Sequence, residues 1–282
     1  MAIIISFLEK GNCFMEKMQK KYYRALTIAG SDSGSGAGIQ ADLKTFTVLG
    51  VYGMSVITAL TSQNTIGVQG IHDIPAQFVG LQLDSVLSDI GVDAVKTGML
   101  SNKNIIGVVA EKIKDYKIKK LVIDPVMVSK HRSKLLQDSA INTLIKKLIP
   151  LAMIITPNKN EAEIIANITI RNISDMKKSA QIIYQLGAQY VFIKGGHIKG
   201  DADDLIFDGK NFILLNNERI KNRHTHGTGC TLSAAITAYL AMNYPPIEAI
   251  KSGKNFVTQT IKYAFKLGQG IGPVNHIYKF YK

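Results

Sequence analysis

His226-Gly227-Thr228-Gly229-Cys230-Thr231-Leu232-Ser233-Ala234-Ala235 is the most informative stretch of this 282-residue chain. It leads into an alanine-rich segment without glycine or proline before Pro245, which predicts a helix. The first N–H groups of a helix have no internal acceptor, and the helix dipole is positive at that end. Because Gly227 and Gly229 carry no Cβ atom, the backbone can approach a ligand closely. The stretch therefore predicts an anion site at a helix start.

Cys230 would lie in the first turn of this helix, where the dipole is expected to lower the pKa of the thiol. An anion site beside a group that takes a proton from a hydroxyl is what phosphoryl transfer needs. The alternative is a tight loop before a packing helix, with Cys230 as a small buried residue. Taken alone, the stretch leaves both interpretations open.

Short apolar segments alternate with helical patterns from Ala25 onward, which indicates an α/β fold. Because the central strands are continuously apolar, we expect a mostly parallel sheet with helices on both faces. A hairpin is expected around Asp208-Gly209. The predicted strands are residues 25–29, 54–61, 94–97, 121–124, 153–156 and 190–194, and the predicted helices are 37–49, 75–89, 102–114, 138–148, 159–166, 175–186, 231–241 and 247–267. Ligands bind such sheets beyond the carboxyl ends of the strands.

The composition, 46% hydrophobic and 20% charged, is that of a folded protein. The apolar runs are too short to cross a bilayer. Two cysteines, Cys13 and Cys230, form no disulfide framework, which favours the cytoplasm. We expect residues 1–17 to be a flexible extension and residues 18–282 to form a single domain.

The net charge of +13 comes from basic residues spread along the chain. A nucleic-acid-binding protein concentrates them on one surface. The spread therefore favours an ordinary solvated surface, and a basic nucleic-acid-binding protein without catalysis remains an alternative from a different class.

Several polar residues stand where predicted strands end. Gln63 offers a paired donor and acceptor that could read the edge of an aminopyrimidine ring or cap its own turn. Lys194 places an ammonium group where it could neutralise phosphate. Asp124 and the Asn158-x-x-Glu161 pair could hold a hydrated Mg²⁺, although an asparagine at a helix start is as often an N-cap.

A second glycine-rich loop, Gly30 to Gly38, follows the first predicted strand and opens a helix. It does not match the dinucleotide pattern G-x-G-x-x-G, and the chain has no Gly-Lys-Ser/Thr of a P-loop. The spacing of histidines and cysteines does not suit zinc, and no Gly-x-Ser-x-Gly elbow occurs. The loop is expected to let the backbone approach a ligand, with a flexible turn as the alternative.

In combination, these motifs resemble the hydroxymethylpyrimidine/phosphomethylpyrimidine kinases of thiamine biosynthesis, in the ribokinase-like superfamily. The resemblance runs in order from about Ala25 to His276. Its stretches are residues 26–32, 38–46, 56–65, 96–100, 123–127, 156–158 with 161–162, 194–197, 226–235 and 270–274. It implies a ribokinase-like α/β fold with a small β flap or hairpin. It also implies two ATP-dependent steps, which convert 4-amino-5-hydroxymethyl-2-methylpyrimidine to its monophosphate and then to its diphosphate.

The resemblance also implies roles for single residues. Gly227, Thr228 and Gly229 would form the hole for the transferred phosphoryl group. Cys230 stands where most of the superfamily carries an aspartate base, so either the dipole tunes the thiol or the thiol mainly positions the hydroxyl. The pyrimidine pocket would comprise Gly30, Gln63, Met99, Val126 and Asp42, of which Asp42 would also suit a cap or a solvent-facing position.

The remaining implied contacts concern the nucleotide and its metal. Lys194 and Thr225 are assigned to nucleotide binding. Asp124, Asn158 and Glu161 would organise Mg²⁺ through water. The expected protein is a homodimer that binds the pyrimidine and ATP, and neither nucleic acid nor a membrane.

Two points stay open. Residues 129–134 replace the Ser-Gly-Asp-type turn common in the family, and their added positive charge could favour phosphorylated ligands. The close rival is a pyridoxal/pyridoxine kinase of the same superfamily. Such kinases tend to lack the glutamine at the position of Gln63, so this residue favours the pyrimidine substrate, while dual activity remains possible.

Overall fold

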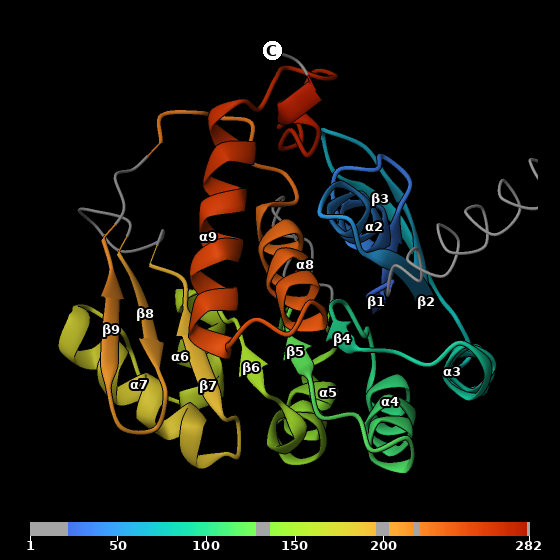
Figure 1. Ribbon diagram of the computed structural model, residues 1–282, viewed down its shortest axis with the longest axis horizontal. Helices are drawn as coiled ribbons and strands as arrows, with labels where there is room; N and C mark the ends of the chain where they lie inside the picture. The colour runs from blue at the N-terminus through green and yellow to red at the C-terminus, as the bar shows by residue number, and fades with distance from the viewer. Residues whose placement is uncertain (1–21, 128–135, 196–202, 217–219, 281–282) are drawn as a thin grey trace, which may run out of the picture.

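The computed structural model describes residues 22–127, 136–195, 203–216 and 220–280. The strands are β1 (Arg24–Asp32), β2 (Tyr52–Gln63), β3 (Val68–Asp73), β4 (Ala94–Thr97), β5 (Leu121–Ile123), β6 (Ile154–Ile155), β7 (Tyr190–Ile193), β8 (Asp204–Phe207) and β9 (Phe212–Leu215). They form one sheet in the order β3-β2-β1-β4-β5-β6-β7-β8-β9 (Figure 1). The six strands from β2 to β7 in this order are parallel, and β3, β8 and β9 pair antiparallel. The mostly parallel sheet is thereby confirmed.

Helices cover both faces of this sheet, as predicted (Figure 1). One face carries α2 (Gly38–Val48), α8 (Thr228–Ala241) and α9 (Pro246–Lys262). The other carries α3 (Ala76–Asp89), α4 (Lys103–Asp115), α5 (Asp138–Thr143), α6 (Lys159–Ala166) and α7 (Ile173–Gln185). The predicted hairpin is present as β8 and β9, and it extends the edge of the central sheet beyond β7.

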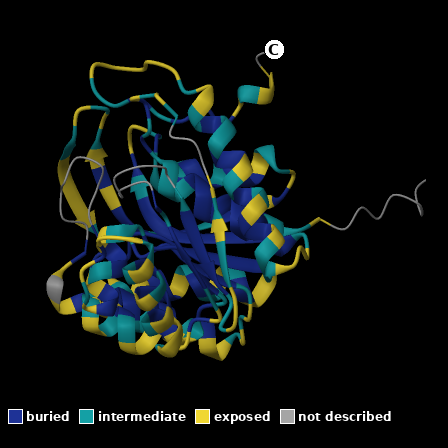
Figure 2. Cartoon of the chain, turned by 90° about the vertical axis from the view of Figure 1, so that its left-hand side faces the viewer, coloured by how far each residue is buried: buried dark blue, intermediate teal, exposed yellow. Residues whose placement is uncertain are grey.

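The alternation of side chains along a strand divides the core into two layers. In β5, Leu121 and Ile123 pack toward α3–α7, whereas Val122 packs toward α2, α8 and α9. All three are fully buried. A strand buried on both faces needs apolar residues at consecutive positions, and Figure 2 shows the resulting buried sheet between partly exposed helices.

A few element boundaries differ from the sequence prediction. The helix predicted at 231–241 begins earlier, at Thr228. The last helix ends at Lys262 instead of 267, where the ring of Tyr263 stacks on that of Tyr278. The helix predicted at 138–148 is α5 followed by a π-helical turn, Leu144–Leu148. The expected extension, residues 1–17, and the segment 129–134 lie outside the described residues.

No described helix is both long enough and apolar enough to cross a membrane.

The two glycine loops lie directly against each other. Gly227, the N-cap of α8, has a φ of 82°, and a Cβ atom there would clash with the carbonyl of Gly36. A Cβ atom at Gly36 would in turn clash with the ring of His226. Glycine is required at both positions because only it provides the missing space and, at Gly227, tolerates the backbone conformation.

The segment that contains Pro273 and His276 also contacts the start of α8. His226 and Pro273 form a parallel bridge. The Nε2 atom of His276 lies 2.9 Å from the hydroxyl of Thr231, and both side chains are buried. This contact ties the end of the chain to the first turns of α8.

We expect His276→Asn to flatten the pH dependence of stability below neutrality. Burial, with the positive charge of Lys44, lowers the pKa of His276 from 6.5 to about 4. The unfolded chain therefore binds this proton more readily than the folded protein. The free energy of unfolding should consequently fall as the pH drops from 6.5 toward 4, by up to ~3 kcal/mol from this residue.

Urea denaturation of wild type and variant across this pH range measures the effect. His72, which is exposed on β3, provides the matched control as His72→Asn. Parallel stability curves for wild type and His276→Asn would contradict the expectation.

Candidate active site

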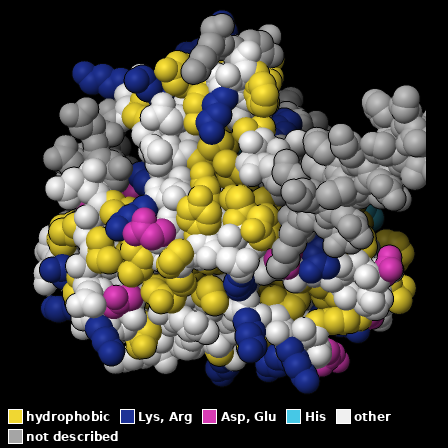
Figure 3. Space-filling model, viewed as in Figure 1, with side chains coloured by type: hydrophobic (Ala, Val, Ile, Leu, Met, Phe, Trp, Pro, Cys, Tyr) yellow, Lys and Arg dark blue, Asp and Glu magenta, His cyan; other side chains and the backbone are white. Residues whose placement is uncertain are grey.

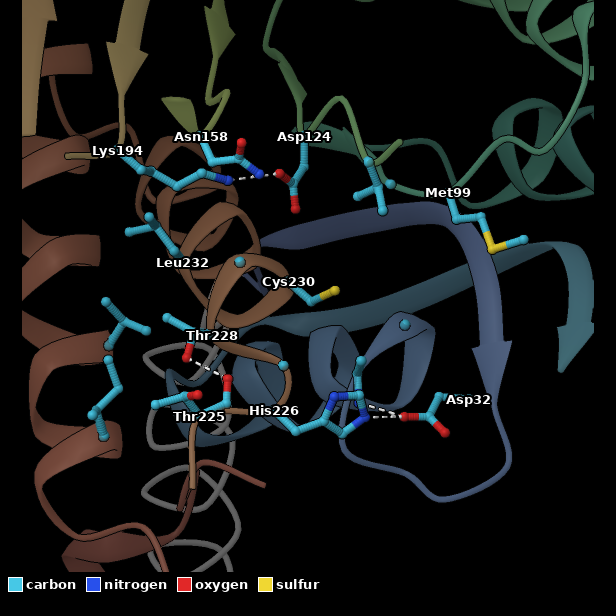
Figure 4. Close-up of a pocket in the computed structure, with 18 of the residues that line it drawn as sticks. Asp32, Met99, Asp124, Asn158, Lys194, Thr225, His226, Thr228, Cys230 and Leu232 are labelled. Carbon is cyan, nitrogen blue, oxygen red and sulfur yellow. Dashed lines mark hydrogen bonds and ion pairs between the residues drawn. The ribbon is translucent and has the colours of Figure 1, made fainter. Parts of the chain in front are cut away.

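A cavity of about 1490 Å³ opens at the carboxyl ends of the parallel strands. It lies between the ends of β1, β4, β5, β6 and β7, the start of α8 and one face of α9 (Figure 4). Every predicted site residue except one lines it, namely Gly30, Gln63, Met99, Val126, Asp124, Asn158, Glu161, Lys194, Thr225, Gly227, Thr228, Gly229 and Cys230. Parallel strands explain the convergence, because all their carboxyl ends meet at one edge of the sheet.

One part of the wall is apolar with an amide at its rim. Met99 and Val126 line it after β4 and β5. A Cβ atom at Gly30 would come within 3.1 Å of the Met99 sulfur, so a larger residue there would narrow the space. Gln63, at the end of β2, contributes the amide. An apolar wall with one amide suits a flat, polar-edged ring.

The start of α8 provides backbone donors. In the described part of the chain, the amides of Gly229 and Cys230 have no hydrogen-bond acceptor. The amide and the hydroxyl of Thr228 instead face the carbonyl of Thr225, at 3.3 and 2.8 Å. Open amides at the positive end of a helix dipole are the donors that the predicted anion site needs, and the site itself stays a prediction.

Lys194 lies beside this anion site. Its Nζ atom is 3.1 Å from Asp124 Oδ1 (Figure 4). The same atom is 4.0 Å from Glu161 Oε2. Burial acts against the ammonium charge, but the two carboxylates outweigh it and raise the pKa of Lys194. A Cβ atom built on Gly229 would be 3.7 Å from this Nζ and 3.6 Å from Asp124 Oδ2. The space next to Gly229 is therefore bounded by a cation and a carboxylate.

Asn158 and Glu161 form a capping box at the start of α6. Asn158 Oδ1 accepts from the Glu161 amide at 3.0 Å, and Glu161 Oε2 accepts from the Asn158 amide at 2.7 Å. Burial raises the pKa of Glu161 to about 7, despite the opposing effect of Lys194. Both residues thus have a structural role in α6, which is the N-cap interpretation that the sequence left open for Asn158.

The metal ligands predicted from the sequence meet around Lys194. The described residues contain no group of three or more carboxylate, histidine or cysteine side chains suited to a metal ion. Asp124 and Glu161 nevertheless both approach Lys194, although Asp124 Oδ2 also accepts from the Ser233 hydroxyl and Glu161 Oε2 from the Asn158 amide. One or two carboxylates completed by water and substrate phosphates are a donor set that fits Mg²⁺.

Cys230 corrects the expectation of a lowered thiol pKa. Burial raises the pKa of Cys230 to about 11, although the charge of Lys96 and the amide of Gly38 favour the thiolate. Removal of the thiolate from water is the largest cause of this shift. Cys230 therefore carries a neutral thiol at physiological pH.

Asp42 corrects the predicted substrate contacts. It is fully buried, does not line the cavity, and holds Lys96 Nζ at 2.7 Å with both carboxylate oxygens. The hydroxyl of Thr27 donates to Asp42 at 2.6 Å. Since a buried ammonium requires a paired carboxylate, the role of Asp42 is to neutralise Lys96.

The far side of the cavity was not predicted from the sequence. It is lined by one face of α9, with Lys254, Val257, Thr258, Ile261 and Lys262, and by residues 220–223. The spacing of these α9 residues at i, i+3, i+4, i+7 and i+8 is that of a helix face. The same spacing also describes a helix face packed in a core, so only the cavity identifies it as a ligand surface.

Known proteins resemble this chain over most of its length. The model of the phosphomethylpyrimidine kinase family matches residues 32–275. A hydroxymethylpyrimidine/phosphomethylpyrimidine kinase of Bacillus subtilis is 48% identical over 256 residues, which cover 90% of this chain and 94% of that protein. The thiamine biosynthesis bifunctional protein ThiED of Geobacter sulfurreducens is 51% identical over 253 residues, 89% of this chain. The chain spans only 52% of that relative's length.

A solved structure has a similar fold. It is the ADP complex of Bacillus subtilis pyridoxal kinase, with a TM-score of 0.85 and 44% identity. The match covers 91% of this chain and 98% of the pyridoxal kinase chain.

We expect Cys230 to react slowly with iodoacetamide near neutral pH, because only the thiolate is nucleophilic and this thiol keeps its proton up to a pH of about 11. In a Cys13→Ser protein, the alkylation rate at Cys230 should rise about tenfold for each pH unit above neutrality. Mass spectrometry of the peptide follows the reaction, with glutathione as the reference thiol. A rate that levels off near pH 7 would mean that the thiolate already predominates there, against this expectation.

Proposed function

The chain belongs to the phosphomethylpyrimidine kinase family, and from this premise we propose that it transfers phosphoryl groups from ATP to 4-amino-5-hydroxymethyl-2-methylpyrimidine and then to the resulting monophosphate. The two steps supply the pyrimidine diphosphate for thiamine biosynthesis. The observation that carries the proposal is the pair of open amides of Gly229 and Cys230 next to the ammonium of Lys194. Together they offer a preorganised site for the transferred phosphoryl group.

The two ends of the cavity would hold the two substrates. The pyrimidine would lie against Met99 and Val126 with its edge at Gln63. The nucleotide would lie along α9, where Lys262 suits the charge of its phosphates. Lys254, on the same face of α9, forms an ion pair with Asp204. Lys194 and Thr225 stand between these ends and would contact the phosphates near the point of transfer.

The neutral thiol of Cys230 fits both steps. Phosphoryl transfer passes through a loose transition state in which little proton removal is needed early, so a strong base contributes less than positioning. A thiol can position the hydroxymethyl group in the first step. In the second step the acceptor is itself a phosphate, which an aspartate at this position would repel and a neutral thiol does not.

Asp124 and Glu161 would hold Mg²⁺ through water, with the phosphates of the nucleotide completing its shell. The ion would neutralise charge that develops on the phosphates during transfer. Asn158 would support the site indirectly, by fixing α6 and the Glu161 side chain through the capping box.

We further propose that the enzyme acts as a homodimer in the cytoplasm and binds no nucleic acid. The wide spread of its basic residues supports the last point, since Figure 3 has Lys and Arg side chains scattered over the face it displays rather than gathered in one patch.

A pyridoxal kinase is the second candidate, because a pyridoxal kinase structure is so similar to this chain. Steady-state ADP release with the pure protein tests the choice. We expect a kcat/KM for the hydroxymethylpyrimidine at least tenfold above that for pyridoxal. A clear preference for pyridoxal would replace the proposed function with the second candidate. If neither substrate stimulates ADP release, both candidate functions are wrong.

We expect Gly229→Ala to slow phosphoryl transfer strongly without destabilising the fold. The added methyl group meets no atom closer than 3.6 Å, but it would stand in the proposed phosphoryl site. Alanine should even stabilise the helix slightly. The kcat/KM should fall roughly a hundredfold or more.

Gly107→Ala is the matched control, because this helical glycine of α4 has open space around its Cβ position. It should leave both activity and melting temperature near the wild-type values. Wild-type kinetics in Gly229→Ala would mean that the phosphoryl group binds elsewhere.

A further inference from the structure

His226 stands between an aspartate and the amide that is proposed to read the pyrimidine. Its Nε2 atom is 2.8 Å from Asp32 Oδ2 (Figure 4). The same atom is 3.2 Å from Gln63 Nε2. His226 and Asp32 are both buried. One ring nitrogen therefore faces two partners, and which partner it can bond depends on whether it carries a proton.

The charge state of Asp32 determines whether His226 Nε2 carries a proton. Asp32 accepts the amides of Gly34 at 2.8 Å, Gly36 at 3.2 Å and Ala37 at 2.8 Å. Although burial opposes ionisation, His226 and the hydrogen bonds from the amides of Ala37 and Gly34 keep the pKa of Asp32 below its usual value. An ionised carboxylate only accepts hydrogen bonds. His226 Nε2 must therefore carry a proton and donate it toward Asp32.

A protonated Nε2 cannot form a hydrogen bond with the –NH₂ group of Gln63, because both groups are donors. Before any rotation, Gln63 Oε1 lies 3.2 Å from Thr61 Oγ1. A half turn of the amide about its last side-chain bond exchanges its two ends, so that Oε1 faces His226 and the –NH₂ group faces Thr61 Oγ1. The Thr61 hydroxyl donates to the Ser31 carbonyl at 3.0 Å, so it is able to accept from the amide. After the half turn the amide oxygen, and no longer a second donor, lies beside the Nε2–H group that His226 directs toward Asp32, and one amide N–H faces the Thr61 oxygen.

We propose that Asp32, His226 and Thr61 lock the Gln63 amide in this one orientation, and that the lock makes the site select a 4-aminopyrimidine over a 4-oxopyrimidine. The inference rests on the proposed function, because it assumes that Gln63 reads the ring edge. His226 acts here as a positioning residue through Gln63. The lock leaves one N–H and one oxygen lone pair of the amide for the ligand.

The chemistry of the two ring edges explains the selectivity. A 4-aminopyrimidine presents a ring-nitrogen acceptor beside an amino donor, and a 4-oxopyrimidine presents an N–H donor beside a carbonyl acceptor. A freely turning glutamine amide pairs with either edge by reversing itself. A locked amide pairs with one, and the other edge leaves buried polar groups unpaired.

The test compares kcat/KM for the 4-amino substrate with kcat/KM for its 4-oxo analogue. In His226→Phe the ring remains but its donor is gone, and in Thr61→Val the acceptor is gone while the shape is kept. We expect the amino-to-oxo ratio to fall about tenfold in each variant. Because the ratio is internal to each protein, a general loss of activity does not affect it, and Thr61→Val tests the lock without changing the loop before α8.

A spectroscopic measurement tests the proton independently of activity. The ¹⁵N–¹H correlation spectrum of the histidine rings in the wild-type protein should show His226 Nε2 protonated at neutral pH, with the His226→Phe spectrum used for assignment. An unprotonated Nε2 would overturn the lock.

Gln63→Met separates failure of the inference from failure of the proposed function. If Gln63→Met raises KM for the 4-amino substrate but His226→Phe and Thr61→Val keep the wild-type ratio, then Gln63 reads the ring and the lock is wrong. If Gln63→Met leaves that KM unchanged, the proposed role of Gln63 itself fails, and the lock with it.

Discussion

The close contact of two backbone loops holds this site together. The loop of residues 33–37 follows β1, and the start of α8 comes after β9 in the chain. Gly36 and Gly227 nevertheless approach so closely that neither has room for a side chain. The contact carries His226 to Asp32 and aims the first amides of α8 at the cavity. The proposed substrate wall and the proposed phosphoryl site are thus held against each other by backbone contacts.

Charge is arranged around this unit in two layers. Below the cavity, Lys96 and Asp42 neutralise each other in full burial. At the cavity wall, Lys194 is shared between Asp124 and Glu161 and stays charged next to Gly229. The pair of Lys96 and Asp42 adds no net charge near Cys230. At the cavity wall, the ammonium group of Lys194 stays available to a phosphate. Burial explains why the pKa of Cys230 is raised, whereas the pKa of a thiol at an exposed helix start is lowered.

Much of the architecture followed from local patterns. The continuous apolar runs predicted buried parallel strands, and the residues that end them predicted the edge where the cavity lies. The bounds of β4 and α6 agree with the prediction because both are set by sharp local signals, such as Gly98 after β4 and the capping residue Asn158 before α6. The end of α9 was misplaced, because Tyr263 packs on a ring far along the chain and no local signal marks it.

What the sequence by itself determined is the set of groups that reach the site, namely strand ends, glycines at a helix start, one lysine, one thiol, two side-chain amides and two carboxylates, all near the ends of their elements. Only the tertiary structure decided their states. Asp42 proved to be the partner of a buried lysine, the thiol of Cys230 proved neutral, and α9 proved to form a cavity wall. The physical reason is that protonation and partnership depend on burial and on atoms brought close by folding, whereas position at the end of an element is written in local hydrophobic periodicity.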